Sequence, residues 1–117
     1  MSALTIYHNP KCSKSRETLA LLQGRGTAPH IIEYLKTPPS SAELTAIVRM
    51  LGIRPEALVR KGEDVFKQRY AGKTLTDAQW ITAMIADPIL IERPIVVAGD
   101  KAAIGRPPEQ VLRLLSP

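Results

Sequence analysis

The residues best suited to chemistry surround a single cysteine, Cys12, in the segment His8-Asn9-Pro10-Lys11-Cys12-Ser13-Lys14-Ser15-Arg16. A cysteine that only fills space usually has apolar neighbours, whereas these are polar and basic. A thiol placed where a helix begins, near positive charge, ionises more readily and becomes a nucleophile. We therefore interpret Cys12 as a reactive thiolate, and a small buried cysteine is the alternative.

Other side chains of the same segment could assist this thiolate. His8 stands four residues upstream, at the end of a predicted strand, where it could influence the ionisation of Cys12. The hydroxyls of Ser13 and Ser15 could donate hydrogen bonds to a bound oxyanion or to the sulfur. Free N–H groups at a helix start bind anions. The segment thus predicts a nucleophile of low pKa beside a small anion site, although His8 could equally be a capping or surface histidine.

Having one cysteine limits the possible redox chemistry. It excludes an internal disulfide, a CxxC pair and a cysteine-based zinc site. Any thiol chemistry at Cys12 would therefore need a second thiol from another molecule.

The first part of the chain is expected to place Cys12 between a strand and a helix. Residues 3–7 are β-prone, residues 8–13 form a polar loop, and residues 14–24 predict a helix that ends at glycine. Residues 30–35 predict a second strand. This β-α-β order implies two parallel strands with a right-handed crossover.

The rest of the chain predicts helices followed by a hairpin. Two capping boxes, Ser40 with Glu43 and Thr76 with Gln79, each precede a helical apolar pattern. One or two short helices are expected over 57–70. Residues 94–98 and 101–104 predict strands joined by a turn at Gly99-Asp100, and a last helix starts at Pro107. We therefore predict one α/β domain, 1–117: a thioredoxin-like βαβ…ββα mixed four-stranded sheet with a helical insertion at about 40–87.

The net charge and the hydropathy pattern limit the classes of binding partner that we expect. The chain carries 16 Lys+Arg against 11 Asp+Glu, a net charge of +5, which favours nucleic acid, phosphorylated metabolites or oxyanions. Its few aromatic residues do not alternate with basic ones, which disfavours stacking on single-stranded nucleic acid. No apolar run suits a membrane helix and the N-terminus lacks a secretory pattern. We expect a cytoplasmic protein with no membrane and no nucleic-acid partner, a nucleic-acid-binding module being an alternative from charge alone.

The cysteine segment resembles the active-site segment of the glutaredoxin-coupled arsenate reductases. Further blocks fit that family in order and spacing, and together they span nearly the whole chain: Tyr34-Leu35-Lys36-Thr37-Pro38-Pro39, Leu58-Val59-Arg60-Lys61, Pro88 to Val97, and Ile104-Gly105-Arg106-Pro107-Pro108-Glu109. The resemblance implies a thioredoxin-like fold with a helical insertion, which agrees with the pattern above.

The resemblance also implies roles for particular residues. Cys12 would be the catalytic nucleophile, His8 the active-site histidine and Pro94 a cis-proline. The oxyanion-binding arginines would be Arg60, Arg93 and Arg106. A guanidinium suits this role because it stays protonated and offers a planar fork of donors to a tetrahedral anion.

The implied reaction is the reduction of arsenate, or a similar oxyanion, to arsenite, with glutathione as co-substrate and glutaredoxin as partner. No tightly bound cofactor, no metal and a monomer are expected. Two alternatives remain. One is a thiol oxidoreductase acting on another oxidant or on glutathione mixed disulfides. The other is a non-enzymatic regulator that binds RNA polymerase, although such regulators commonly carry a CxxC pair where this chain has Cys12 and Ser15.

Overall fold

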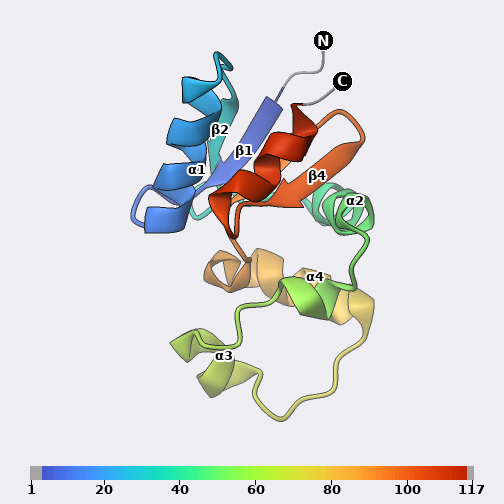
Figure 1. Cartoon of the computed structure of the whole chain (residues 1–117). Helices are drawn as coiled ribbons and strands as arrows, with labels where there is room; N and C mark the ends of the chain where they lie inside the picture. Colours follow the sequence, from blue (N-terminus) through green and yellow to red (C-terminus); the bar gives the residue numbers. More distant parts are fainter. Residues whose placement is uncertain (1–3, 116–117) are drawn as a thin grey trace. The chain divides into compact units, whose positions relative to one another are not determined.

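The computed structural model describes residues 4–115, which fall into two compact units. The first, here called the sheet unit, joins Met1–Thr37 to Arg93–Pro117, and the second, the helical unit, is Pro38–Glu92. In Figure 1 the sheet unit carries the blue and red ends of the colour range, and the helical unit carries the green to orange middle. The helical unit contains the segment 40–87 that was expected to be an insertion.

The sheet unit has the predicted mixed four-stranded sheet. Its strands are β1 (Leu4–His8), β2 (His30–Glu33), β3 (Ile95–Ala98) and β4 (Lys101–Ile104), in the order β2-β1-β3-β4. β1 runs parallel to β2 and antiparallel to β3, which pairs with β4 as a hairpin. Helix α1 (Ser13–Gly24) connects the two parallel strands. The predicted fold class, the parallel pairing of the first two strands and the hairpin of the last two are therefore confirmed.

Two elements of the sheet unit differ from the prediction. β2 ends at Glu33 rather than at residue 35, because the N–H groups of Lys36 and Thr37 both donate to the Glu33 carbonyl, at 2.9 and 3.0 Å, and turn the chain away. The last helix is the 3-10 helix η3 (Pro108–Leu114), which starts just after a cis peptide bond between Arg106 and Pro107.

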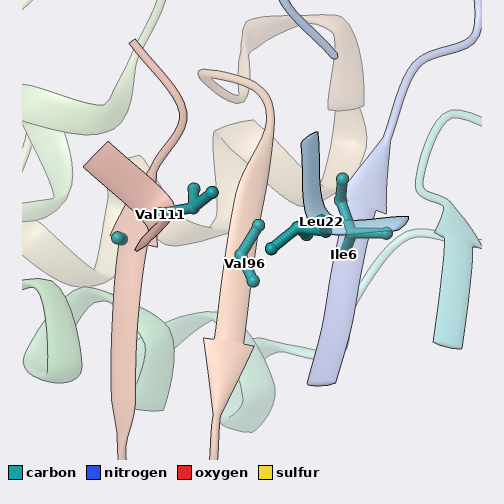
Figure 2. Close-up of a cluster of buried hydrophobic side chains, with 5 residues drawn as sticks. Ile6, Leu22, Val96 and Val111 are labelled. Atoms are coloured by element: carbon teal, nitrogen blue, oxygen red, sulfur yellow. The ribbon is translucent and has the colours of Figure 1, made fainter. Parts of the chain in front are cut away.

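The core of the sheet unit fixes α1 on the sheet. Ile6, Val96 and Ala103 occupy matching register positions on β1, β3 and β4, and all three are fully buried. Leu22 of α1 and Val111 of η3 complete the cluster, and Figure 2 shows the four labelled side chains gathered together. Burying each of the larger side chains, Ile6, Leu22, Val96 and Val111, contributes roughly 1.5–3 kcal/mol. This cluster packs the last turn of α1 against the sheet.

The helical unit consists of short helices with the predicted caps. They are α2 (Ser41–Leu51), η1 (Pro55–Leu58), α3 (Asp64–Arg69), α4 (Asp77–Ala86) and η2 (Pro88–Leu90). Both predicted capping boxes form: the Ser40 hydroxyl caps α2 and the Thr76 hydroxyl caps α4, each answered by the side chain three residues later. Within the described range 4–115, no helix has the length and apolar character needed to cross a membrane.

A short backbone pairing inside the helical unit joins two distant segments. Val59 and Ile91 form an antiparallel bridge. On either side of it the Arg60 N–H donates to the Leu90 carbonyl at 2.7 Å, and the Glu92 N–H donates to the Leu58 carbonyl at 2.9 Å. This pairing places Arg60 beside Glu92.

Candidate active site

Cys12 occupies the N-cap position of α1, in a tight turn after β1. Its N–H donates to the Asn9 carbonyl at 3.0 Å, and its carbonyl accepts the Arg16 N–H at 3.0 Å. The loop is tied further by the Asn9 Oδ1, which accepts the Lys11 N–H at 3.0 Å, and by the Arg16 guanidinium, which donates to the Pro10 carbonyl at 2.9 Å. The backbone thus presents a partly exposed thiol at the start of a helix.

Several donors favour the charged form of this thiol. Burial raises the pKa of Cys12, but the backbone N–H of Ser15, the side chain of Arg93 and the backbone N–H of Lys14 together lower it below its ordinary value. The sulfur does not close a regular capping hydrogen bond, yet it lies where the free N–H groups of the first helical turn stabilise negative charge. The geometry and the charges agree with a thiolate.

Two arginines from the open end of the β3–β4 hairpin act on the sulfur. Ile95 and Ile104 are the last register pair there, so Arg93 and Arg106 each lie two residues beyond the ladder. Nη2 of Arg106 lies 3.5 Å from Cys12 Sγ, and its Nε donates to the Arg93 carbonyl at 2.7 Å. The side chain of Arg93 supplies the other contribution to the thiolate. The Arg93–Pro94 bond, for which a cis bond was expected, is cis.

Gly105 permits a close approach of chain segments next to these arginines. Its N–H donates to the Pro94 carbonyl at 2.9 Å. A Cβ at this position would overlap the Thr18 hydroxyl and would lie 2.8 Å from Cγ of Pro94. Thr18 is fully buried on α1. Only a glycine therefore lets the chain leading into Arg106 pass between α1 and the cis-proline.

The Ser15 hydroxyl has partners inside the protein. It is fully buried, it accepts the Asn9 N–H at 3.0 Å, and it shares a 2.6 Å hydrogen bond with Nδ1 of His8. That the Ser15 hydroxyl binds an oxyanion stays a prediction, whereas the backbone N–H of Ser15 already acts on the Cys12 sulfur. The Ser13 side chain is exposed, and its binding role stays a prediction.

His8 supports the loop through this hydrogen bond. The side chain is 7% exposed and faces Glu33 across the β1–β2 register. Burial lowers the pKa of His8 from its ordinary value of 6.5, Glu33 acts in the opposite direction, and Arg16 lowers it further. His8 is therefore neutral near pH 7 and holds Ser15 in place.

Arg60 belongs to the helical unit, where two carboxylates hold it. Its Nε lies 3.2 Å from Glu63 Oε2 and its Nη1 lies 2.7 Å from Glu92 Oε1. Sequence reasoning missed these glutamates, as it missed Gly105, although Glu92 stands next to Arg93 in the chain. Among residues 4–115, no cluster of His, Cys, Asp and Glu is arranged to hold a metal ion.

Comparison with known proteins identifies the family of this chain. Residues 7–114 match the ArsC family, to which this chain therefore belongs. The chain is 49% identical over 112 residues to the uncharacterized protein YfgD of Escherichia coli K12, with 94% of each chain covered. It is 46% identical over 116 residues to an arsenate reductase of Escherichia coli, covering 98% of this chain and 82% of that one.

A solved structure shares the fold. The arsenate reductase from Vibrio cholerae matches with a TM-score of 0.92 and 50% sequence identity, covering 97% of this chain and 98% of that one. The mixed sheet and its helices are thus the thioredoxin-like fold of this family.

Proposed function

We propose that this protein reduces arsenate to arsenite with Cys12 as the nucleophile. The observation that carries the proposal is the convergence on one thiol of a helix start and two arginines, with Arg106 Nη2 3.5 Å from Sγ. The similarity to arsenate reductases of comparable length supports the same reaction.

Donor groups of the site would bind the oxygens of arsenate. The forks of Arg93 and Arg106 and the N–H groups of the first turn of α1 suit a tetrahedral anion, because guanidinium and backbone donors match its oxygens. Ser13 is a further ligand in this proposal, and Arg60 enters it from the family resemblance. His8 is a positioning residue that acts through Ser15 on the loop.

The first step forms a sulfur–arsenic bond. The Cys12 thiolate attacks arsenic and displaces one arsenate oxygen, which leaves as water after taking protons from solvent. The arginines stabilise the negative charge that collects on the remaining oxygens. Arsenic stays As(V) in this step.

The later steps need thiols from other molecules. Glutathione displaces a second oxygen as water and forms a sulfur–arsenic bond. A glutaredoxin thiolate then attacks the glutathione sulfur, and the electron pair of that sulfur–arsenic bond stays on arsenic, giving As(III) and a glutaredoxin–glutathione disulfide. Water hydrolyses the Cys12–arsenic bond, which releases arsenite and restores the thiol. Because the chain has one cysteine, no internal thiol can replace these partners. A reducing cytoplasm supplies them, and we propose a cytoplasmic monomer.

Turnover with each component omitted tests this proposal. With glutathione and glutaredoxin present, arsenite should form; omitting either should stop multiple turnovers, and Cys12→Ser should abolish the reaction in a folded protein. Arg106→Lys should lower kcat/KM for arsenate roughly ten- to a hundredfold, since lysine lacks the fork. Arg25→Lys, on an exposed arginine of the same unit, is the matched control. Full activity of Cys12→Ser would refute the proposal.

A second candidate is a thiol oxidoreductase acting on another oxidant or on glutathione mixed disulfides. The observation that favours it is the partly exposed Cys12 thiol with its lowered pKa, because a thiolate also attacks disulfide sulfur. Reduction of a glutathione mixed disulfide, without turnover of arsenate in the complete mixture, would select this candidate.

A further inference from the structure

Asn9 is one of the few polar side chains that the protein buries. Among the described residues the buried polar or charged ones are His8, Asn9, Ser15 and Thr18, and Asn9 is 5% exposed. Burying an amide costs free energy unless its polar atoms find partners. Three of these residues, all but Thr18, surround the loop that carries Cys12, and hydrogen bonds join them. The burial of this amide therefore indicates a polar role in the loop.

The side chain of Asn9 closes a second turn inside a backbone turn. The Cys12 N–H donates to the Asn9 carbonyl at 3.0 Å, which makes a four-residue turn over 9–12. Within it the Asn9 Oδ1 accepts the Lys11 N–H at 3.0 Å. Asparagine suits this arrangement because its side-chain oxygen reaches a backbone N–H two residues ahead. An apolar side chain of the same size would remove this acceptor, and the turn would lose one of these two closing hydrogen bonds.

The backbone of Asn9 ties this turn to the helix that follows it. Its N–H donates to the Ser15 hydroxyl at 3.0 Å, and Ser15 is the third residue of α1. The backbone N–H groups of Ser15 and Lys14 are among the donors that lower the pKa of Cys12. Asn9 thus contacts the chain on both sides of the cysteine, before it through Lys11 and after it through Ser15.

We propose that Asn9 is a positioning residue, whose Oδ1 holds the turn in which the Cys12 sulfur meets the N–H groups of the first turn of α1. Asn9 acts through the backbone of Lys11 and Cys12, and not by contact with a substrate. Its consequence for arsenate reduction rests on the proposed function, whereas the reactivity of the thiol can be measured without arsenate. A looser turn would let the sulfur move away from these donors, so the thiolate would be a smaller fraction of the protein at neutral pH.

Two small substitutions separate the effect of the Asn9 oxygen from that of its volume. Asn9→Ala removes the acceptor, whereas Asn9→Ser removes nearly the same volume but keeps a hydroxyl that closes the same kind of turn more weakly. Gln23→Ala is the matched control, because it removes an exposed amide near the other end of α1. All three variants retain Arg93 and Arg106, which act on the sulfur, and the neighbouring His8. A shift in thiol reactivity therefore reports the loop.

The rate of Cys12 alkylation by iodoacetamide as a function of pH is the first measurement. Asn9→Ala should raise the midpoint by about one pH unit, so that alkylation below the midpoint slows roughly tenfold while the rate at high pH changes little. Asn9→Ser should fall between Asn9→Ala and the parent protein, and Gln23→Ala should match the parent. In the complete arsenate assay, kcat/KM of Asn9→Ala should fall by the same factor below the midpoint and approach the parent value above it.

Hydrogen exchange of the Lys11 N–H is the second measurement, because it reports the hydrogen bond itself. Exchange should be slowest in the parent protein, faster in Asn9→Ser and fastest in Asn9→Ala. The same order in exchange and in alkylation midpoint would connect the turn to the thiol. A faster exchange without any change in the midpoint would contradict that connection.

Several other results would overturn the inference. The parent midpoint in Asn9→Ala, even with a lower Tm, would mean that Asn9 supports only the fold. Equal shifts in Asn9→Ala and Asn9→Ser, or a similar shift in Gln23→Ala, would show that the Asn9 oxygen is not the cause. If Asn9→Ala does not fold, a midpoint of Asn9→Ser equal to that of the parent would still contradict the inference.

The two proposals fail separately. A thiol that shifts as expected in a protein that never reduces arsenate contradicts the proposed function alone. Normal arsenate reduction with no shift of the midpoint in Asn9→Ala contradicts this inference alone.

Discussion

Replacing Gly105 by alanine should disturb the active site through a single added methyl group. The new Cβ would overlap the Thr18 hydroxyl, and would lie 2.8 Å from Cγ of Pro94 and 3.1 Å from Cγ2 of Thr18. Both neighbours are buried, and Thr18 is held by a 2.8 Å hydrogen bond from its hydroxyl to the Lys14 carbonyl. Because neither can move freely, the segment that carries Arg106 should shift instead.

The size of this effect follows from the close contacts. Adding one methyl group to a well-packed region costs about 1–3 kcal/mol of the free energy of unfolding. For a chain of this length that is a fall in Tm of roughly 4–12 °C. The same shift should weaken the 3.5 Å contact between Arg106 and Cys12, so the pKa of Cys12 should rise toward the ordinary value of about 8.5.

Two measurements on the parent protein and four variants test this reasoning: Gly105→Ala, Thr18→Ala, the double variant and Gly24→Ala. Thermal unfolding reports stability, and the pH dependence of Cys12 alkylation reports the pKa of the thiol. Gly24→Ala is the matched control, since nothing lies within 4 Å of its added Cβ, and it should leave both values nearly unchanged. Adding Thr18→Ala to Gly105→Ala removes two of the three crowded atoms, so the double variant should be more stable than the sum of the single effects predicts.

The reasoning would be refuted by a Gly105→Ala protein with the parent Tm and the parent alkylation profile. Additive effects of Gly105→Ala and Thr18→Ala would show that the contact between these two positions is not the cause. A lowered Tm with an unchanged Cys12 pKa would show that Gly105 affects packing but not the ionisation of the thiol.

Three further predictions concern ionisation and a helix cap. The alkylation rate of Cys12 should rise with pH through a midpoint below about 8.5; a midpoint at or above that value would contradict the stabilised thiolate. Because burial lowers the pKa of His8 below 6.5 in the folded state, the unfolded state takes up more protons, and the urea midpoint should fall as the pH drops below about 6.5. His8→Gln should flatten that fall and exposed His30→Gln should not; equal profiles would argue against it. Ser40→Ala should cost about 1 kcal/mol by removing a cap, whereas Ser41→Ala should cost less, and the reverse order in chemical denaturation would count against the capping box.

The sequence carried enough information to predict the elements that local patterns encode. β-Propensity predicted the strands, a terminal glycine marked the end of α1, and the S/T-x-x-E/Q pattern predicted both capped helices, because each signal depends on residues only a few positions apart. The cysteine loop could be assigned for the same reason: a polar, basic turn between a strand and a helix is a local feature.

Contacts between distant positions could not be predicted in this way. Arg60 and Glu92 are 32 residues apart, and no local pattern indicates that a backbone bridge will pair them. The Ser15 hydroxyl lies 2.6 Å from Nδ1 of His8, and no local pattern indicates this pairing across seven positions. The end of β2 depended on two N–H groups competing for one carbonyl, which composition does not reveal.

The two ends of the β3–β4 hairpin should differ in how well they tolerate changes of sequence. Arg93 and Arg106 flank its open end, whereas the exposed Gly99-Asp100 turn closes the other end, beyond the Ala98–Lys101 pair. An exposed turn tip tolerates added residues when the ladder beneath it is intact. The Gly99-Asp100 turn is therefore a suitable place to insert a short peptide label, because the spacing of the two arginines is set at the opposite end of the ladder.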